Sequence, residues 1–294
     1  MNAVHVKIKV AVTGSSGQLG QDFQAILEEY PAMDFTFYSR HDLDVTDEKA
    51  CLEILTNLRP DFIINAAAYT NVEKAEEDKE ANKAGNELAP LYLARAAKSI
   101  NATLIHISTD YVFDGKKELP LDELASVNPL NEYGRAKLNG ENNVLNSGAR
   151  AIVLRTSWLY STFGHNFMKT MIRLAKEKGE LNVVSDQFAS PTYARSLAHD
   201  INRMIIRLDA GQDIELGRYH YSQRGVASWF DFAKEIVKVY ELNVPVHPVD
   251  SNRFPTKAIR PKYSKLAADK FEKNTGIELL SWQEGLMQCK KDMQ

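Results

Sequence analysis

Tyr133 and Lys137 are four residues apart in the chain, and side chains of these two types can carry out proton transfer. If residues 131–146 form a helix, positions i and i+4 lie on one face, so the two side chains are neighbours. A lysine ammonium beside a phenol favours the phenolate and lowers the phenol pKa from its usual value of about 10. The spacing therefore predicts a proton donor, although Lys137 can also be read as a solvated helix residue.

Thr109 follows residues 102–108, an apolar segment that predicts a buried strand. A hydroxyl at the carboxyl end of a strand, opposite the helix of Tyr133, can hydrogen-bond to a carbonyl oxygen that is about to gain charge. We expect His106, inside this strand, to be a core residue rather than a ligand. We expect the acidic loop at residues 118–129 to lie over the site.

A glycine-rich turn lies near the start of the chain, between a predicted strand at residues 8–13 and a predicted helix. Strand, turn and helix in this order are the context that a dinucleotide-binding fingerprint requires. Gly14 would allow the tight turn, Gly17 the approach of the backbone to a pyrophosphate, and Gly20 close packing of the helix. The turn also brings three further residues to the expected cofactor site: Ser16, Gln18 and Leu19. A glycine turn without a ligand is the alternative.

The predicted second strand, residues 35–39, ends at Ser39 and Arg40 rather than at the acidic residue that commonly holds the ribose of NAD. Arg40 is better suited to a 2′-phosphate and favours NADP(H), with a solvated surface charge as the alternative. Asp44 and Val45 would lie near the adenine. A third predicted strand, residues 61–65, leads into further expected cofactor contacts: Ala66, Ala67, Ala68, Tyr69 and Thr70.

The alternation of strands and helices predicts an α/β protein with a Rossmann-type, doubly wound parallel sheet. We expect residues 1–158 to form the dinucleotide-binding domain. Residues 159–294 are expected to form a smaller α+β region that mainly binds substrate and packs closely on the first, with some segments returning to it.

Composition narrows the class of protein. The 294 residues are 44% hydrophobic and 26% charged, which is typical of a globular protein. A formal net charge of -3 gives no basic footprint for nucleic acid, and no apolar run approaches the roughly 20 residues of a membrane span. Cys51 and Cys289 lie far apart and are interpreted as incidental thiols. We expect a cytoplasmic protein with neither nucleic-acid nor membrane partners.

The glycine turn, Thr109 and the Tyr133/Lys137 pair together resemble the extended short-chain dehydrogenase/reductase family. Longer blocks resemble those of the dTDP-4-dehydrorhamnose reductase family in particular, and their order covers nearly the whole chain. These blocks are residues 65–76, 108–115, 155–160 and 186–192.

The resemblance implies reduction of the 4-keto group of dTDP-4-dehydro-L-rhamnose to dTDP-L-rhamnose with NADP(H), or alternatively NAD(H). It implies that Tyr133 protonates the alkoxide at the sugar C4, that Lys137 holds the nicotinamide ribose and that Thr109 orients the carbonyl. The same match assigns four substrate contacts: Asp110 and Trp158 at the sugar, and Asn166 and Arg260 at the diphosphate.

Other members of this family suggest a test for a bound metal ion and two alternative functions. Some relatives are dimers bridged by a cation between carboxylates, but Arg195 stands here where an acid is expected, so we predict no metal and leave a homodimer open. A non-catalytic regulatory subunit would usually lose part of the Thr109, Tyr133 and Lys137 set, which this chain retains. A sugar-nucleotide epimerase is the other alternative, and the blocks after Trp158 fit a reductase better.

Overall fold

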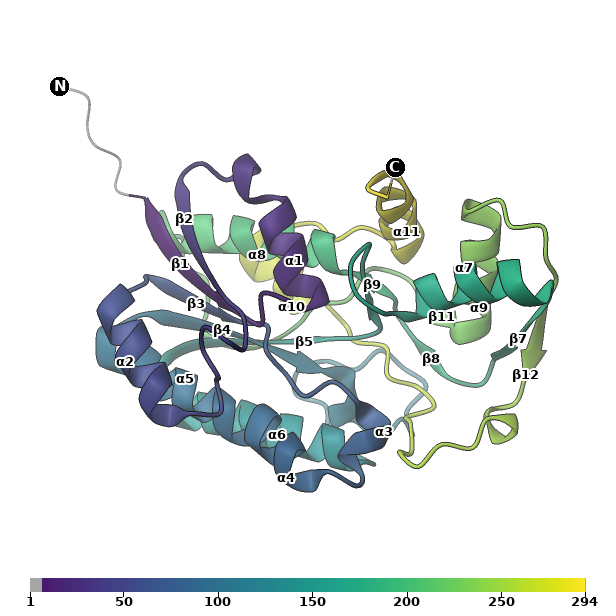
Figure 1. Ribbon diagram of the computed structural model, residues 1–294, viewed down its shortest axis with the longest axis horizontal. Coiled ribbons are helices and arrows are strands. Elements are labelled where there is room, and N and C mark those ends of the chain that lie inside the picture. Colours follow the sequence, from purple (N-terminus) through teal and green to yellow (C-terminus); the bar gives the residue numbers. More distant parts are fainter. Residues whose placement is uncertain (1–6, 294) are drawn as a thin grey trace.

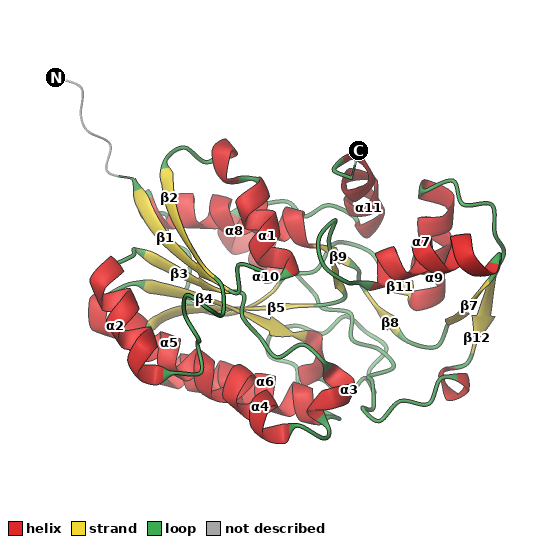
Figure 2. Ribbon diagram, viewed as in Figure 1, coloured by secondary structure: helices red, strands yellow, loops and turns green. Residues whose placement is uncertain are grey.

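The computed structural model describes residues 7–293, in which a six-stranded parallel sheet carries helices on both faces (Figures 1 and 2). In sheet order the strands are β10 (Gly217–His220), β5 (Arg150–Thr156), β4 (Thr103–Thr109), β3 (Phe62–Asn65), β1 (Ile8–Thr13) and β2 (Met33–Tyr38). All neighbouring pairs are parallel. The predicted Rossmann-type fold class is confirmed.

The central strands read as continuous apolar runs because helices cover both of their faces. All four residues of β3 are buried, as are six of the seven in β4. The strand order reverses between β1 and β3, and parallel sheets bind ligands in the crevice that opens at the carboxyl ends of such strands. The fold therefore places a binding crevice beside the glycine turn.

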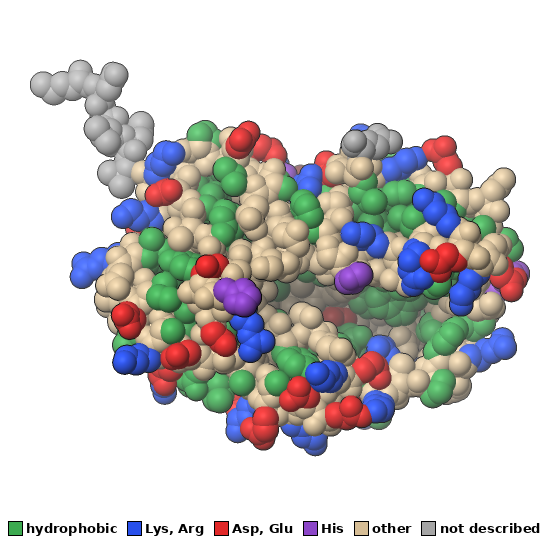
Figure 3. All heavy atoms as spheres, viewed as in Figure 1, with side chains coloured by type: hydrophobic (Ala, Val, Ile, Leu, Met, Phe, Trp, Pro, Cys, Tyr) green, Lys and Arg blue, Asp and Glu red, His purple; other side chains and the backbone are tan. Residues whose placement is uncertain are grey.

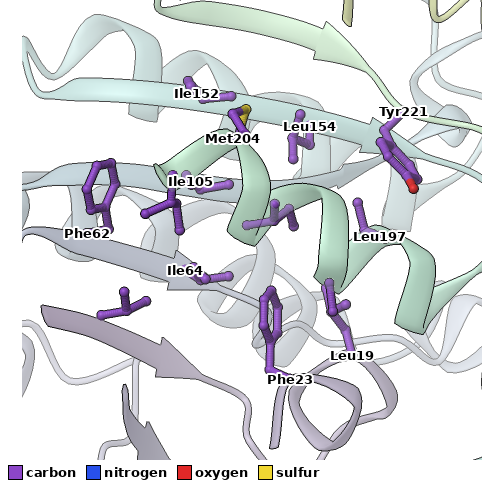
Figure 4. Packing of buried hydrophobic residues seen from close by; sticks show 14 of the residues in the cluster. Leu19, Phe23, Phe62, Ile64, Ile105, Ile152, Leu154, Leu197, Met204 and Tyr221 are labelled. Carbon is purple, nitrogen blue, oxygen red and sulfur yellow. The ribbon is translucent and has the colours of Figure 1, made fainter. Parts of the chain in front are cut away.

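One face of the sheet is covered by α1 (Gln18–Ala25), α8 (Ala194–Asp209) and α10 (Asp269–Thr275). Figure 4 shows Phe23 of α1 and Leu197 and Met204 of α8 packed over Ile64 and Ile105 of the sheet. Helices from the second half of the chain thus complete a core that begins in the first half.

The opposite face is covered by α2 (Glu48–Leu58), α5 (Ala89–Ile100) and α6 (Glu132–Asn146). Side chains of these helices and of the sheet form a second apolar core, in which Leu55, Leu93 and Val144 are fully buried. The predicted helix at 131–146 is α6, with Asn131 as its N-cap.

A separate group of helices forms the other part of the molecule (Figure 1): α7 (Phe167–Lys178), α9 (Trp229–Val239) and α11 (Trp282–Lys291). Short strand pairs accompany them: β6 (Leu159–Tyr160) with β9 (Thr192–Tyr193), β7 (Leu181–Val184) with β12 (Val246–Val249), and β8 (Phe188–Ala189) with β11 (Ala227–Ser228). The helices and strands share an apolar core that includes Phe232 and Leu286.

A side-chain cap and an irregular turn set two of the helix boundaries. Thr46 is a plausible N-cap of α2 by type, but the Asp47 carboxylate accepts from the Ala50 N–H at 3.1 Å, while Thr46 donates to Asp44. The charged segment before α5 is not one helix: α3 (Val72–Ala75) and α4 (Lys79–Lys83) are followed by a π-helical turn at Ala84–Leu88. Within residues 7–293, no helix has the length and apolar character needed to cross a bilayer.

Candidate active site

A cleft of about 1120 Å³ opens at the carboxyl edge of the sheet, and Figure 3 shows the surface hollowed there with apolar side chains inside. Its walls come from the segments after β1, β2, β3, β4 and β5, from the start of α6 and from α9. The predicted site residues that line it are Gly14, Ser16, Gly17, Gln18, Leu19, Arg40, Asp44, Val45, Ala66, Ala67, Ala68, Tyr69, Thr70, Thr109, Asp110, Tyr133, Lys137 and Trp158.

At the glycine turn, the backbone after β1 lies very close to the backbone after β3. Gly14 has a φ of +71°, and a Cβ there would lie 2.6 Å from the Ala67 nitrogen. Gly20 does not line the cleft; a Cβ on it would lie 2.6 Å from the Ser15 Cα, so it serves helix packing. No side chain caps the start of α1 at Gly17, and Gly17, Gln18 and Leu19 at this start line the cleft, so the first N–H groups of the helix are available there. This cradle fits the pyrophosphate of a dinucleotide.

Arg40 lies on the rim of the cleft, directly after β2. Its side chain is 84% exposed, and its Nε lies 3.5 Å from the Asp44 carboxylate. An ion pair this exposed is worth little, so the guanidinium can turn to a stronger anion at small cost. The segment after β2 thus presents a cation to the cleft edge, while the hydroxyl of the preceding Ser39 donates to Asp42 at 2.6 Å.

Tyr133 and Lys137 lie in the first two turns of α6, which Asn131 caps by accepting from the Gly134 N–H at 2.8 Å. Lys137 is 2% exposed, and its Nζ donates to the carbonyl oxygen of Ile107, the third-last residue of β4, at 2.6 Å. Burial lowers the Lys137 pKa to about 8, against the opposing charge of Glu141. An ammonium with so few partners can donate a further hydrogen bond to a hydroxyl of a ligand.

The phenol of Tyr133 differs from expectation in its acidity. Burial raises its pKa above the ordinary value, and a hydrogen bond with Thr109 opposes this only in part. The predicted lowering by Lys137 is wrong, because burial raises the Tyr133 pKa and the Lys137 ammonium is engaged with Ile107. Tyr133 is therefore protonated near neutral pH and is able to donate.

Thr109 and Asp110 form the floor of the cleft at the end of β4. The Thr109 Oγ1 accepts from the Tyr111 N–H at 3.2 Å and donates to the Asp110 Oδ1 at 3.2 Å. Asp110 also accepts from the Ser264 hydroxyl at 2.5 Å, and burial raises its pKa to about 7. The cleft wall thus contains a second group that titrates near neutral pH.

The acidic loop at 118–129 does not line the cleft. Instead, Leu121 pairs with the chain near Leu266, donating its N–H to the Lys265 carbonyl at 2.8 Å. The expectation that this loop lies over the site is wrong, because its backbone finds its partners in the C-terminal segment. His106 is a fully buried core residue, as predicted.

Trp158 and Trp229 form an aromatic wall of the cleft. Their rings are stacked with centroids 3.4 Å apart and an interplanar angle of 7°. Trp158 has a φ of +47°, which a bulky residue rarely adopts. Trp229 could not be predicted as a site residue, because it lies far along the chain at the start of an ordinary amphipathic helix. Ser108, Tyr111 and Trp229 line the cleft in addition to the predicted residues.

Two of the predicted substrate contacts lie outside the lining of the cleft. Asn166 caps α7 by accepting from the Lys169 N–H at 3.0 Å, and its amide donates to Gln18 at 2.9 Å. Arg260 pairs with Glu73 at 2.7 Å. Side-chain capping and an ion pair, which spacing cannot reveal, hold both residues away from the lining.

Arg195 and the cysteines also have defined surroundings. Arg195 pairs with Asp22 at 3.1 Å and Asp292 at 3.3 Å. Across residues 7–293, no three His, Cys, Asp or Glu side chains gather in a way that could hold a metal ion. Cys51 and Cys289 are buried free thiols.

Comparison with known proteins gives a consistent set of relatives. The family model described as "RmlD substrate binding domain" matches residues 8–294. The chain is 36% identical over 285 residues to a dTDP-4-dehydrorhamnose reductase of Aggregatibacter actinomycetemcomitans, covering 95% of this chain and 97% of the relative. It is 36% identical over 289 residues to the reductase of the same name from Escherichia coli (strain K12), covering 95% and 96%.

Solved structures agree with these relatives. The dTDP-4-dehydrorhamnose reductase of Bacillus anthracis str. Ames, solved in complex with NADP, matches with a TM-score of 0.91 and 38% identity, covering 98% of this chain and 100% of that one. UDP-glucose 4-epimerase from Brucella ovis, in complex with NAD, matches with a TM-score of 0.78 at 18% identity, covering 96% of each chain. That likeness is one of fold.

Proposed function

The chain belongs to the RmlD substrate binding domain family, and we propose that it reduces the 4-keto group of dTDP-4-dehydro-L-rhamnose to give dTDP-L-rhamnose, using NADP(H). One observation carries the proposal: Thr109, Tyr133 and Lys137 line the same cleft as the glycine turn at Gly14 and Gly17. A proton donor thus lies in the cavity that is built to hold a dinucleotide.

The residues that would hold the cofactor lie just after the carboxyl ends of the strands. The turn at Gly14 and the free N–H groups at the start of α1 fit the pyrophosphate. Arg40 provides a cation for the 2′-phosphate, while Lys137 provides a hydrogen-bond donor for the nicotinamide ribose. When bound, the reduced nicotinamide supplies the hydride that the reduction requires.

Three side chains would stabilise or neutralise the charge that develops on the substrate oxygen. Thr109 donates a hydrogen bond to the carbonyl oxygen, and Tyr133 transfers its proton to the alkoxide at the sugar C4. The ammonium of Lys137 stabilises the phenolate that is left, since an opposite charge nearby favours the ionised form. The raised pKa of Tyr133 keeps the proton in place until the alkoxide, a stronger base, is formed.

We assign the remaining predicted contacts to the two parts of the substrate, the sugar and the diphosphate. The Trp158 face offers an apolar surface for the deoxyhexose methyl group, and Asp110 faces the same cavity. Arg260 and Asn166 would meet the diphosphate after exchanging their present partners, Glu73 and Gln18. This assignment gives residues 159–294 the main share of substrate binding and residues 1–158 the cofactor. We further propose a cytoplasmic enzyme, with a homodimer as the assembly to test by sedimentation.

Two other functions make different predictions for cofactor consumption. An epimerase would recycle its nicotinamide and show no net oxidation, and a regulatory subunit would bind NADPH without turnover. Incubation with NADPH and dTDP-4-dehydro-L-rhamnose should oxidise one NADPH for each sugar reduced, followed by the absorbance of reduced nicotinamide. With NADPH deuterated at the transferred position, the label should appear at C4 of the product sugar. Product without net oxidation, or no product, would contradict the proposal.

A further inference from the structure

Glu141 is a fully buried carboxylate on α6, one turn beyond Lys137. Tyr133, Lys137 and Glu141 follow one another at intervals of four residues and therefore lie along one face of the helix. A buried charge is costly unless it is paired and hydrogen-bonded, so its partners show what it is for.

Three side chains hold the Glu141 carboxylate. The Ser108 hydroxyl donates to Oε1 at 2.5 Å, and Arg155 of β5 donates to both oxygens, with its Nη2 2.7 Å from Oε2. Arg218 of β10 donates to Oε2 at 3.1 Å. The carboxylate thus connects the helix to three adjacent strands of the sheet.

The contact with Ser108 reaches the cleft itself. Ser108 lines the cleft directly before Thr109, and Lys137 donates to the carbonyl of the preceding residue, Ile107. The side chains of Lys137 and Glu141 therefore fasten α6 to successive residues at the end of β4. This arrangement fixes the distance between the Tyr133 phenol on the helix and the Thr109 hydroxyl on the strand.

The charge of Glu141 also faces Lys137, and it opposes the burial that lowers the Lys137 pKa. The other titratable and charged groups packed around this pair are His106 on β4, Arg155 on β5, Arg218 and His220 on β10, Glu123 at the His220 N–H, and Asp110 and Tyr133 on the cleft side. Burial lowers the pKa of both His106 and His220, so both are neutral near pH 7. Without Glu141, the guanidinium groups of Arg155 and Arg218 would lose the carboxylate with which they pair.

We propose that Glu141 is a positioning residue for the reduction: it holds α6 against the end of β4 through Ser108, and it places a negative charge one helical turn from the ammonium of Lys137. The inference rests on the proposed function, in which Lys137 acts as a cation. A purely structural ion pair would affect folding alone.

Two variants separate the charge of Glu141 from its hydrogen bond. Glu141→Gln keeps an oxygen to accept from Ser108 and removes the charge, so the alkaline limb of the kcat pH profile should move to lower pH by about one unit, the low end of the effect of a nearby opposite charge. Ser108→Ala keeps the charge, so kcat should fall at every pH while the limb stays in place. A Glu141→Gln profile that coincides with that of the wild type would overturn the proposal.

A matched control is available on α8. Asp200 is a buried carboxylate that accepts from Tyr221 at 2.8 Å and pairs with Arg203, and it does not line the cleft. Asp200→Asn should leave the alkaline limb unchanged. The same shift in this control would show that the effect comes from general loosening, and would also contradict the proposal.

A third variant keeps the test decisive if Glu141→Gln fails to fold. Arg218 is partly exposed, with 27% of its side chain accessible, so Arg218→Met should fold and leave Glu141 with less countercharge. The alkaline limb should then move to higher pH, opposite to the shift in Glu141→Gln. An unchanged alkaline limb in a folded Arg218→Met variant would contradict the proposed effect of the Glu141 charge on Lys137.

Binding of NADPH alone distinguishes this inference from the proposed function. The NADPH Kd of each variant, measured against pH by fluorescence without sugar, should show the same displacements of its alkaline midpoint. If the wild type reduces no dTDP-4-dehydro-L-rhamnose, the proposed function fails while the binding midpoints still test Glu141. If the wild type reduces the sugar but no midpoint moves, Glu141 has only a structural role.

Discussion

In the proposed function, Arg40 is the residue that selects between the two nicotinamide cofactors. A contact between guanidinium and phosphate is charge-assisted, so its loss should cost about 1.5–3 kcal/mol. Arg40→Ala should therefore raise the NADPH Kd about tenfold or more and leave the NADH Kd nearly unchanged. Arg95, an exposed arginine of α5 that does not line the cleft, provides the control Arg95→Ala. Equal weakening of both cofactors would show that Arg40 acts structurally.

The positions of residues that depend on local spacing could be predicted. Tyr133 and Lys137 share one face of a helix, and Gly14 lies in the glycine turn. The residues next to them in the sequence are therefore enough to predict their geometry. Trp229 and Glu141 could not be found in this way, because their importance comes from contacts with Trp158 and Arg155, on other elements. The phenol acidity was also mispredicted, since burial is a property of the folded chain.

At the scale of elements, α6 is the part whose position matters most, and glycine allows it to pack closely. A methyl group at Gly140 would overlap the carbonyl of Asn86 in the π-helical turn before α5. The strand and helix order along the first half could be predicted from apolar runs and turns. The π-helical turn could not, because its irregular backbone matches the packing of α6 rather than a local preference.

Gly140→Ala should therefore destabilise the protein despite the better helix propensity of alanine. Overpacking typically costs about 1–3 kcal/mol, whereas alanine gains only about 0.5–1 kcal/mol over glycine in a helix. Urea unfolding should show a lower midpoint for this variant. Asn142→Ala, an exposed change on the same helix, should leave the midpoint nearly unchanged. A Gly140→Ala protein as stable as the wild type would contradict this prediction, because it would show that the π-helical turn can shift to make room for the methyl group.

At the scale of the whole molecule, buried polar groups connect the C-terminal segment to the sheet. Ser264 donates to Asp110 at the end of β4, and Lys265 donates to Ser222 at 2.9 Å. Such contacts between distant parts of the sequence could not be predicted, since no spacing relates them. They also make the stability of the molecule depend on pH.

Asp110 provides the test of this dependence. Its folded pKa is about 7 and its ordinary value 3.8, so between these values the folded chain holds a proton that the unfolded chain has lost. Stability should therefore fall as the pH rises through this window. Asp110→Asn does not titrate, so its stability relative to the wild type should improve from about pH 5 to about pH 8, by on the order of 1–3 kcal/mol in urea unfolding. The exposed change Asp213→Asn should show no such trend, and a pH-independent difference for Asp110→Asn would contradict the account.

The most direct test of the reduction mechanism is the turnover of Tyr133→Phe, which removes one hydroxyl from the cleft and keeps the ring against Tyr111. Measured with NADPH and dTDP-4-dehydro-L-rhamnose, kcat should fall by about 10² or more, the usual contribution of general acid catalysis, while the NADPH Kd stays close to that of the wild type. Near-normal turnover in a folded Tyr133→Phe protein would contradict the assignment of Tyr133 as the proton donor.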